Sequence, residues 1–175
     1  MFCSSCREHL GFFNFRTAAV TLLKWQVSLK SVSGVFPNIS ECLAATIIST
    51  IARSGSSKSF ITPMRETIPK NQDGPDSEKP KALHIWVLNS GIFYSSSRTG
   101  QCKPAIKLLY RRVSLGEANQ VLESITCDAQ ELNMPAKALN EIAEILDDSN
   151  MLLPVKDRLF KQWRVGLLPR WHTNV

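Results

Sequence analysis

The pattern of hydrophobic and polar positions is most regular after Asn38. Asn38 and Glu41 have the spacing of a capping box, in which each side chain accepts a hydrogen bond from the other residue's backbone. Apolar residues then recur every three to four positions, as on one face of an α-helix. They are Ile39, Leu43, Ala44, Ile47, Ile48 and Ile51. The pattern predicts a helix that ends near Gly55, followed by a short strand over residues 59–62.

Two further helices are predicted in the second half of the chain. The first covers residues 114–123 and has Glu117 at its third helical position. The second begins at Pro135, because proline is best tolerated in the first turn of a helix. The polar run 147–150 should end it. Its apolar positions are Leu132, Leu139, Ile142 and Leu146.

Alternation of apolar and polar residues predicts a strand near each end of the chain. Residues 24–30 place Trp25, Val27 and Leu29 on one face, which is typical of a strand with one solvated side. Residues 162–168 alternate in the same way and close the chain as a strand. The apolar run over residues 17–23 does not alternate, and no element is predicted there.

The middle of the chain has the pattern of an antiparallel meander. Residues 83–88 are nearly all apolar, as in a strand covered on both faces. The turn residues 89–91 should join this strand to a short one over 92–94, forming a hairpin. Residues 105–113 alternate and predict a third strand. Successive strands of this kind favour antiparallel pairing.

The predicted fold class is α+β, with mainly antiparallel strands and two or three helices. Residues 1–62 contain a cysteine pair, a strand and a helix, and residues 82–175 contain the meander and the remaining helices. Both segments are expected to belong to one structural unit. Residues 63–81 hold four prolines and few large apolar side chains, which predicts a flexible linker or loop.

The charge is moderately basic. The 175 residues include 21 Lys and Arg against 15 Asp and Glu, a formal net charge of +6. Only residues 156–170 are locally basic, and no dense basic stripe is present. Nucleic-acid binding by this segment therefore remains an alternative that the composition disfavours.

Composition also bears on localisation. No apolar run approaches the length of a membrane-spanning helix, so we expect no membrane association through such a helix. Five irregularly spaced cysteines indicate a reducing compartment, which means the cytoplasm and/or the nucleus. Glu8 is the only acidic residue among the first forty residues. A low content of acidic residues is also found in organelle transit peptides.

Cys3 and Cys6 form the clearest motif that carries chemistry. The C-x-x-C spacing presents two thiolates to one zinc ion, and a second pair is normally needed to complete the tetrahedron. No second pair is present in this sequence, so the motif predicts half of a zinc knuckle at the N-terminal end of the fold. A redox pair and ordinary surface thiols are the alternatives.

Cys42 is the leading candidate for a nucleophile. It falls in the first turn of the predicted helix, where backbone amides favour a thiolate. The alternative is that Cys42 is a small buried apolar residue. Cys102 lies in a polar turn, and Cys127 precedes Asp128, which disfavours a thiolate. No phosphate-binding glycine loop, zinc-protease helix or serine-nucleophile elbow is present in the sequence.

Several short motifs, in this order, resemble the HECT-like ubiquitin-conjugating-enzyme-binding family. The resemblance covers most of the chain. The motifs are Cys3-Ser-Ser-Cys6 with Leu10-Gly11, Lys24-Trp25-Gln26-Val27, the block Leu83 to Ser90, the block Ala105 to Tyr110, and the stretch from Leu152-Leu-Pro154 to Trp163 and Val165. Relative to the family pattern, the chain resembles the C-terminal portion. An earlier cysteine pair would complete the zinc site with Cys3 and Cys6, and residues 13–23 look like an insertion or a mis-joined segment.

The resemblance implies a ubiquitin-protein ligase. Such a protein binds a ubiquitin-loaded conjugating enzyme, accepts ubiquitin as a thioester on a cysteine, and passes it to a lysine of a protein substrate. Cys42 is the candidate acceptor in this chain, and Cys3 and Cys6 are the candidate zinc ligands. The alternative is a non-catalytic interaction module, with a docking surface on the sheet that carries Trp86 and Tyr94 or on the helix after Pro135.

Overall fold

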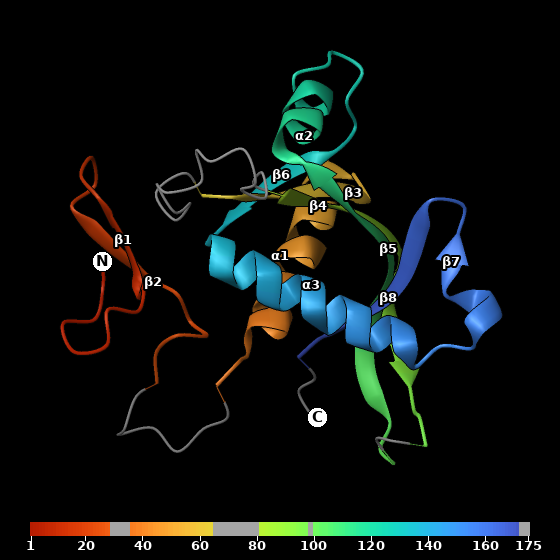
Figure 1. Cartoon of the computed structure of the whole chain (residues 1–175). Helices are drawn as coiled ribbons and strands as arrows, with labels where there is room; N and C mark the ends of the chain where they lie inside the picture. The colour runs from red at the N-terminus through yellow and green to blue at the C-terminus, as the bar shows by residue number, and fades with distance from the viewer. Residues whose placement is uncertain (29–35, 65–80, 98–99, 172–175) are drawn as a thin grey trace, which may run out of the picture.

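A six-stranded sheet forms the centre of the molecule (Figure 1). The computed structural model describes residues 1–28, 36–64, 81–97 and 100–171. The strand order across the sheet is β6-β3-β4-β5-β8-β7. The bounds are Lys58–Pro63 for β3, Lys81–Tyr94 for β4, Lys103–Ser114 for β5, Gln130–Met134 for β6, Leu159–Phe160 for β7 and Trp163–Pro169 for β8. A separate antiparallel pair joins β1 (Gly11–Asn14) to β2 (Ala19–Leu22).

The pairing confirms the α+β class with mainly antiparallel strands. β3 with β4, β4 with β5, β5 with β8 and β7 with β8 are all antiparallel. The pair β3 and β6 is parallel. These two strands are not consecutive in the sequence, because β4, β5 and α2 lie between them. The described residues also contain three α-helices and one short 3₁₀ helix: α1 (Ile39–Ser54), α2 (Leu115–Leu122), α3 (Ala136–Met151) and η2 (Val155–Asp157).

The predicted helix starts are confirmed. The Asn38 side chain accepts from the Glu41 amide at 2.9 Å, and the Glu41 carboxylate accepts from the Asn38 amide at 2.9 Å, which completes the capping box of α1. Gly55 ends this helix with φ of 74°, a left-handed conformation that glycine adopts without strain. The Ser114 hydroxyl caps α2 by accepting from the Glu117 amide at 3.1 Å.

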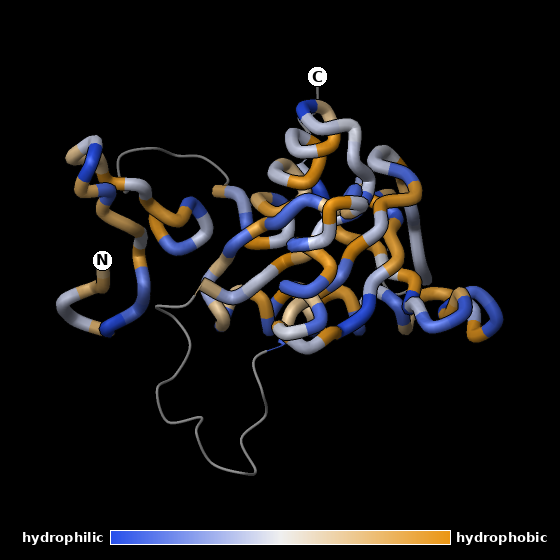
Figure 2. The backbone as a smooth tube through the Cα atoms, turned by 90° about the horizontal axis from the view of Figure 1, so that it is seen from above, coloured by the Kyte–Doolittle hydropathy of each residue, from blue (hydrophilic) through white to orange (hydrophobic). Residues whose placement is uncertain are grey.

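The main core lies between one face of the sheet and the two long helices. Figure 2 shows apolar stretches of helix and strand gathered in the body of the molecule. Packing is tight at Gly166 of β8, where an added Cβ would lie 3.0–3.1 Å from side-chain atoms of Leu146 and Tyr110. The larger buried core residues are Ile39, Leu43, Ile47, Ile61, Leu83, Ile85, Ile106, Leu108, Tyr110, Leu139, Ile142, Leu146 and Leu168.

Two smaller clusters cover the opposite face of the sheet. Ala118 of α2 packs with Phe60, Ala82 and Val113 at one end of this face. At the other end, Leu109, Trp163 and Val165 form a cluster against which Trp86 and Leu153 pack. Between these clusters lie the polar groups described below.

The strand predicted over residues 24–30 is wrong for residues 24–28, and residues 29–30 lie outside the described residues. Residues 24–26 form a turn, in which the Gln26 amide donates to the Leu23 carbonyl at 2.9 Å. Trp25 packs against the main core. The alternation corresponds to two half-buried residues, Trp25 and Val27, in a segment that pairs with no described strand, because β1 and β2 pair with each other.

The turn predicted at residues 89–91 does not separate two strands. β4 continues to Tyr94 with register shifts on both sides of Asn89. The Asn89 side chain accepts from the Gly91 amide at 2.9 Å, so these residues form a local irregularity within one long strand. The predicted strands over 59–62, 105–113 and 162–168 are confirmed as β3, β5 and β8.

The predicted end of the third helix is also wrong, as is its first apolar position. Leu132 belongs to β6, and α3 continues through residues 147–150 to Met151. Polar side chains are accommodated there because they bond to the edge of β8. The Asn150 amide group donates to the carbonyls of Arg158 and Val165 at 2.8 and 2.7 Å, and the Ser149 hydroxyl accepts from the Leu167 amide at 2.9 Å.

The predicted linker falls almost entirely on residues 65–80, which lie outside the described residues. β3 ends at Pro63 and β4 begins at Lys81, on either side of it. None of the helices in the described parts of the chain combines the length and apolar character needed to cross a membrane.

Candidate functional site

The N-terminal cysteine pair lies in a tight turn. The Cys3 amide donates to the Glu8 carbonyl at 2.8 Å, and the Arg7 amide donates to the Cys3 carbonyl at 3.0 Å. Hydrogen bonds from the Cys6 backbone, and then from the Ser5 backbone and the Cys6 thiol, lower the pKa of the Cys3 thiol. The turn therefore brings the two sulfur atoms together and favours a thiolate, which is the form that binds metals.

This pair supplies two of the four ligands that a structural zinc site needs. Within the described residues, no group of three or more His, Cys, Asp or Glu side chains is placed to hold a metal ion. The residues present therefore do not fit a complete zinc centre, and no zinc knuckle is shown. The half site at Cys3 and Cys6 stays a prediction.

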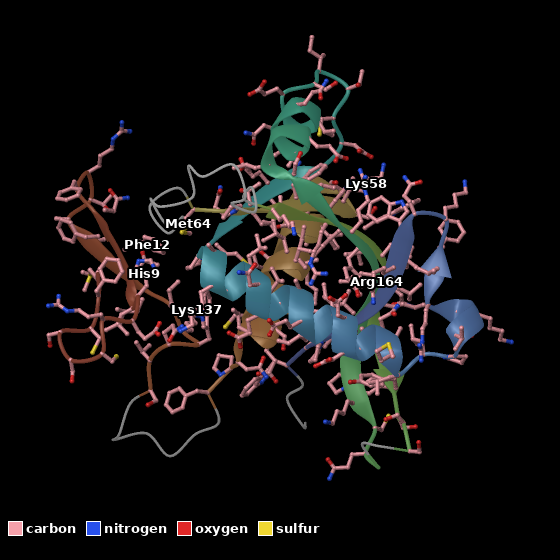
Figure 3. The ribbon with its side chains drawn as sticks, in the orientation of Figure 1. His9, Phe12, Lys58, Met64, Lys137 and Arg164 are labelled. Atoms are coloured by element: carbon pink, nitrogen blue, oxygen red, sulfur yellow. The ribbon has the colours of Figure 1, made fainter. Side chains whose placement is uncertain are left out.

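The N-terminal segment contacts the body of the molecule through α3. Figure 3 shows Lys137, at the start of α3, directed toward this segment, where its ammonium group lies 2.6 Å from the Glu8 carboxylate. His9 and Phe12, also labelled in Figure 3, are in edge contact with ring centres 4.5 Å apart. The same segment continues into one wall of a groove.

This groove, of about 760 Å³, runs along α1. Residues 21–25 form another part of its lining, to which Pro37 and Trp171 also contribute. Its lining is mostly apolar or small, with Lys24, Glu41 and Arg53 as the charged side chains. From α1 the groove receives Glu41, Cys42, Ala45, Thr46, Ser49, Thr50 and Arg53. These positions lie on one side of the helix because they follow its three-to-four residue repeat.

Cys42 is the one cysteine among the residues that line this groove. It is half-buried, and burial raises the pKa of its thiol. The positive charge of Lys24 opposes this effect, and the negative charge of Glu41 adds to it. The thiol is thus protonated at neutral pH, although the helix amides favour a thiolate. Among the described residues that line the groove, none is a histidine that could accept the proton.

The other two candidate cysteines lie elsewhere. Cys102 is exposed just before β5, and Cys127 is half-buried in the connection before β6. The Ala129 amide donates to the Cys127 sulfur at 3.4 Å. All five cysteines are free thiols.

A second polar cluster, on the sheet face opposite the two long helices, was missed by sequence reasoning. His84 of β4 stacks on Phe60 at 4.0 Å between ring centres and meets the Trp163 ring edge-on at 4.7 Å. The Arg111 guanidinium lies 5.2 Å from the centre of the Trp163 ring. Lys58 lies 5.5 Å from the centre of the Trp86 ring. These residues share a face through strand pairing, which no local motif reveals.

Burial, together with the positive charges of Arg111 and Lys58, lowers the pKa of His84 to about 4. The imidazole is therefore neutral at physiological pH. Its Nδ1 lies 3.4 Å from an Arg111 nitrogen, whereas its buried Nε2 has no hydrogen-bond partner in the described structure. A neutral, half-satisfied imidazole among aromatic rings acts here mainly as a packing group.

The fold and its groove define an α+β protein with a thiol in an open apolar groove. Residues 1–165 match the model of the family described as HECT-like ubiquitin-conjugating enzyme (E2)-binding. Because the match covers nearly all of the 175 residues, the chain belongs to this family. Neither the curated proteins nor the solved structures gave a significant match.

Proposed function

We propose that this chain docks a ubiquitin-loaded conjugating enzyme and promotes transfer of ubiquitin to lysines of a protein substrate. Membership of an E2-binding family supports the docking step. The single observation that supports transfer is the position of the Cys42 thiol in the wall of an open groove, where an extended chain terminus can reach it. Five free thiols suit a reducing compartment, so we assign this function to the cytoplasm and/or the nucleus.

The proposed transfer proceeds in two balanced steps. The Cys42 thiol gives its proton to water, and its sulfur attacks the thioester carbonyl carbon of ubiquitin. The bond from that carbon to the conjugating enzyme's cysteine breaks, and the departing thiolate takes up a proton. A substrate lysine amine then attacks the new thioester, forms an amide bond and releases the Cys42 thiol. Because one thioester replaces another in the first step, positioning is the main requirement of the groove.

The test is to mix the purified chain with a ubiquitin-charged conjugating enzyme and to resolve the products on non-reducing and reducing gels. We expect an adduct of the chain with ubiquitin that a thiol reductant removes. In Cys42→Ser, the hydroxyl can form only an ester, so any adduct should resist the reductant and yield to alkali.

Cys102→Ser is the matched control, because Cys102 is exposed and lies away from the groove. It should form the reductant-sensitive adduct as the unmodified chain does. A reductant-sensitive adduct that persists in Cys42→Ser would contradict the assignment of the acceptor.

Docking without a cysteine intermediate is the second candidate function. It is favoured by the raised pKa of Cys42, since an acceptor thiol normally has a depressed pKa or a neighbouring base, and the described lining of the groove contains no histidine. Binding of the charged enzyme with no adduct, from a chain that unfolds cooperatively, would establish this alternative.

A further inference from the structure

The segment between α3 and β8 presents an unusual number of exposed apolar side chains. We call residues 151–161 the β7 arm. It contains the end of α3, the turn η2 and β7. Figure 1 places the arm, labelled at β7, at the opposite side of the molecule from β1 and β2. None of its residues lines the groove that holds Cys42.

Four large apolar side chains of the arm are open to solvent. Met151, Val155, Leu159 and Phe160 are 52%, 78%, 64% and 52% exposed. A single exposed apolar residue is ordinary on a protein surface, but four within eleven residues suggest an interaction surface. None of them belongs to the three core clusters.

Hydrogen bonds hold the arm in one conformation. The Arg158 guanidinium donates to the carbonyls of Leu153 and Met151 at 2.9 and 3.0 Å. The Arg158 carbonyl in turn accepts from Asn150 at 2.8 Å. Leu153 packs beside the cluster that contains Trp163. A preformed arm loses little conformational entropy on binding, which favours its use as a docking element.

The arm carries a net positive charge, and part of this charge is not paired with a carboxylate within the described residues. Lys156, Arg158 and Lys161 outnumber Asp157, which leaves a net charge of +2. The Arg158 guanidinium is engaged by backbone carbonyls. Lys156 and Lys161 are exposed and have no carboxylate partner within the described residues, and Lys161 lies 5.8 Å from the centre of the Phe160 ring. Two free ammonium groups thus border an apolar surface.

From these features we infer that the β7 arm is a docking surface for a protein segment that carries apolar side chains flanked by carboxylates. Leu159 and Phe160 supply apolar contact, and Lys156 and Lys161 pair with the acidic flanks. A nucleic acid fits less well, because its phosphates would leave the four apolar side chains uncovered. This inference is independent of Cys42 and goes beyond the docking of a conjugating enzyme.

The test is selection of peptides from a random display library on the intact chain. We expect enriched peptides to combine Leu, Phe or similar residues with Asp or Glu. Their affinity should fall at least about tenfold for the double variant Leu159→Ser with Phe160→Ser, which loses buried apolar area. The charge-reversed variant Lys156→Glu with Lys161→Glu should also bind less and should lose most of the salt dependence of binding.

Ile125→Ser is the matched control, because Ile125 is fully exposed in the connection after α2. It should bind the selected peptides as the unmodified chain does. All variants alter exposed side chains, and thermal unfolding checks that each one folds. The inference is overturned if no peptide is enriched, if enriched peptides lack acidic residues, or if the arm variants bind as well as the control. Preferential binding of a single-stranded RNA with a steep salt dependence would also overturn it.

Discussion

His84 shows how burial sets the charge of one residue. Its ring lies between Phe60 and Trp163, and Arg111 and Lys58 lie on the same face of the sheet. Protonation would place a third positive charge in this cluster, and the buried ring lacks the hydration that a charged imidazole requires. The pKa of about 4 in the fold compares with an ordinary value of 6.5.

This difference predicts a pH dependence of stability. Between pH 6.5 and pH 4 the unfolded chain binds a proton on His84 that the folded chain does not, so the free energy of unfolding falls as the pH drops through this window. For His84→Phe, we expect a smaller fall, by about 1–3 kcal/mol, since phenylalanine keeps the ring packing but cannot titrate. Urea unfolding at pH 7, 6, 5 and 4.5 measures this difference.

Other groups titrate in the same range, so the informative quantity is the difference between the two proteins at each pH. Equal losses of stability in both proteins would show that His84 does not control this pH dependence.

Cys42 shows what residue patterns could and could not predict of the site. Its place in the first turn of a helix followed from the capping box at Asn38 and Glu41, which is a local signal. The opposing effect of burial on its pKa arises in the folded chain, where residues 21–25 and Trp171 line the same groove as Cys42. A local sequence pattern does not show which distant segments will lie beside α1.

At the scale of elements, helices were predicted better than strand boundaries. The caps at Asn38, Ser114 and Pro135 lie next to the helices they begin, so each start could be predicted from a few neighbouring residues. Strands need partners that are distant in the sequence. β6 and β7 were missed because five and two residues carry little pattern, and pairing with β3 and β8 defines them.

Asn150 links α3 to the edge of β8 and to the β7 arm. Its side-chain amide is buried and donates to the Val165 and Arg158 carbonyls. In Asn150→Ala, both carbonyls lose this donor, and we expect the free energy of unfolding to fall by about 2–4 kcal/mol. Chemical denaturation compared with the unmodified chain measures the loss.

Asn140→Ala is the matched control for this prediction, because Asn140 is exposed on the same helix. It should change the stability by less than about 0.5 kcal/mol. A loss at Asn150 no larger than that at Asn140 would show that these hydrogen bonds do not stabilise the edge of the sheet.

At the scale of the whole molecule, the sheet joins segments from most of the described chain. β3 from the first part pairs with β4 and β6 from the second, and α1 packs in the same core as α3. The groove with Cys42 and the β7 arm lie in different parts of this framework. Under the two proposals made above, a conjugating enzyme and a second protein segment would therefore be bound at separate places.

The most direct test of this account is calorimetric titration of the folded chain with a ubiquitin-conjugating enzyme, with and without attached ubiquitin. The account predicts saturable binding of the conjugating enzyme by the unmodified chain, and equal binding by Cys42→Ser, because docking does not require the acceptor thiol. A chain that unfolds cooperatively and yet binds no conjugating enzyme from a representative panel would contradict the proposed function.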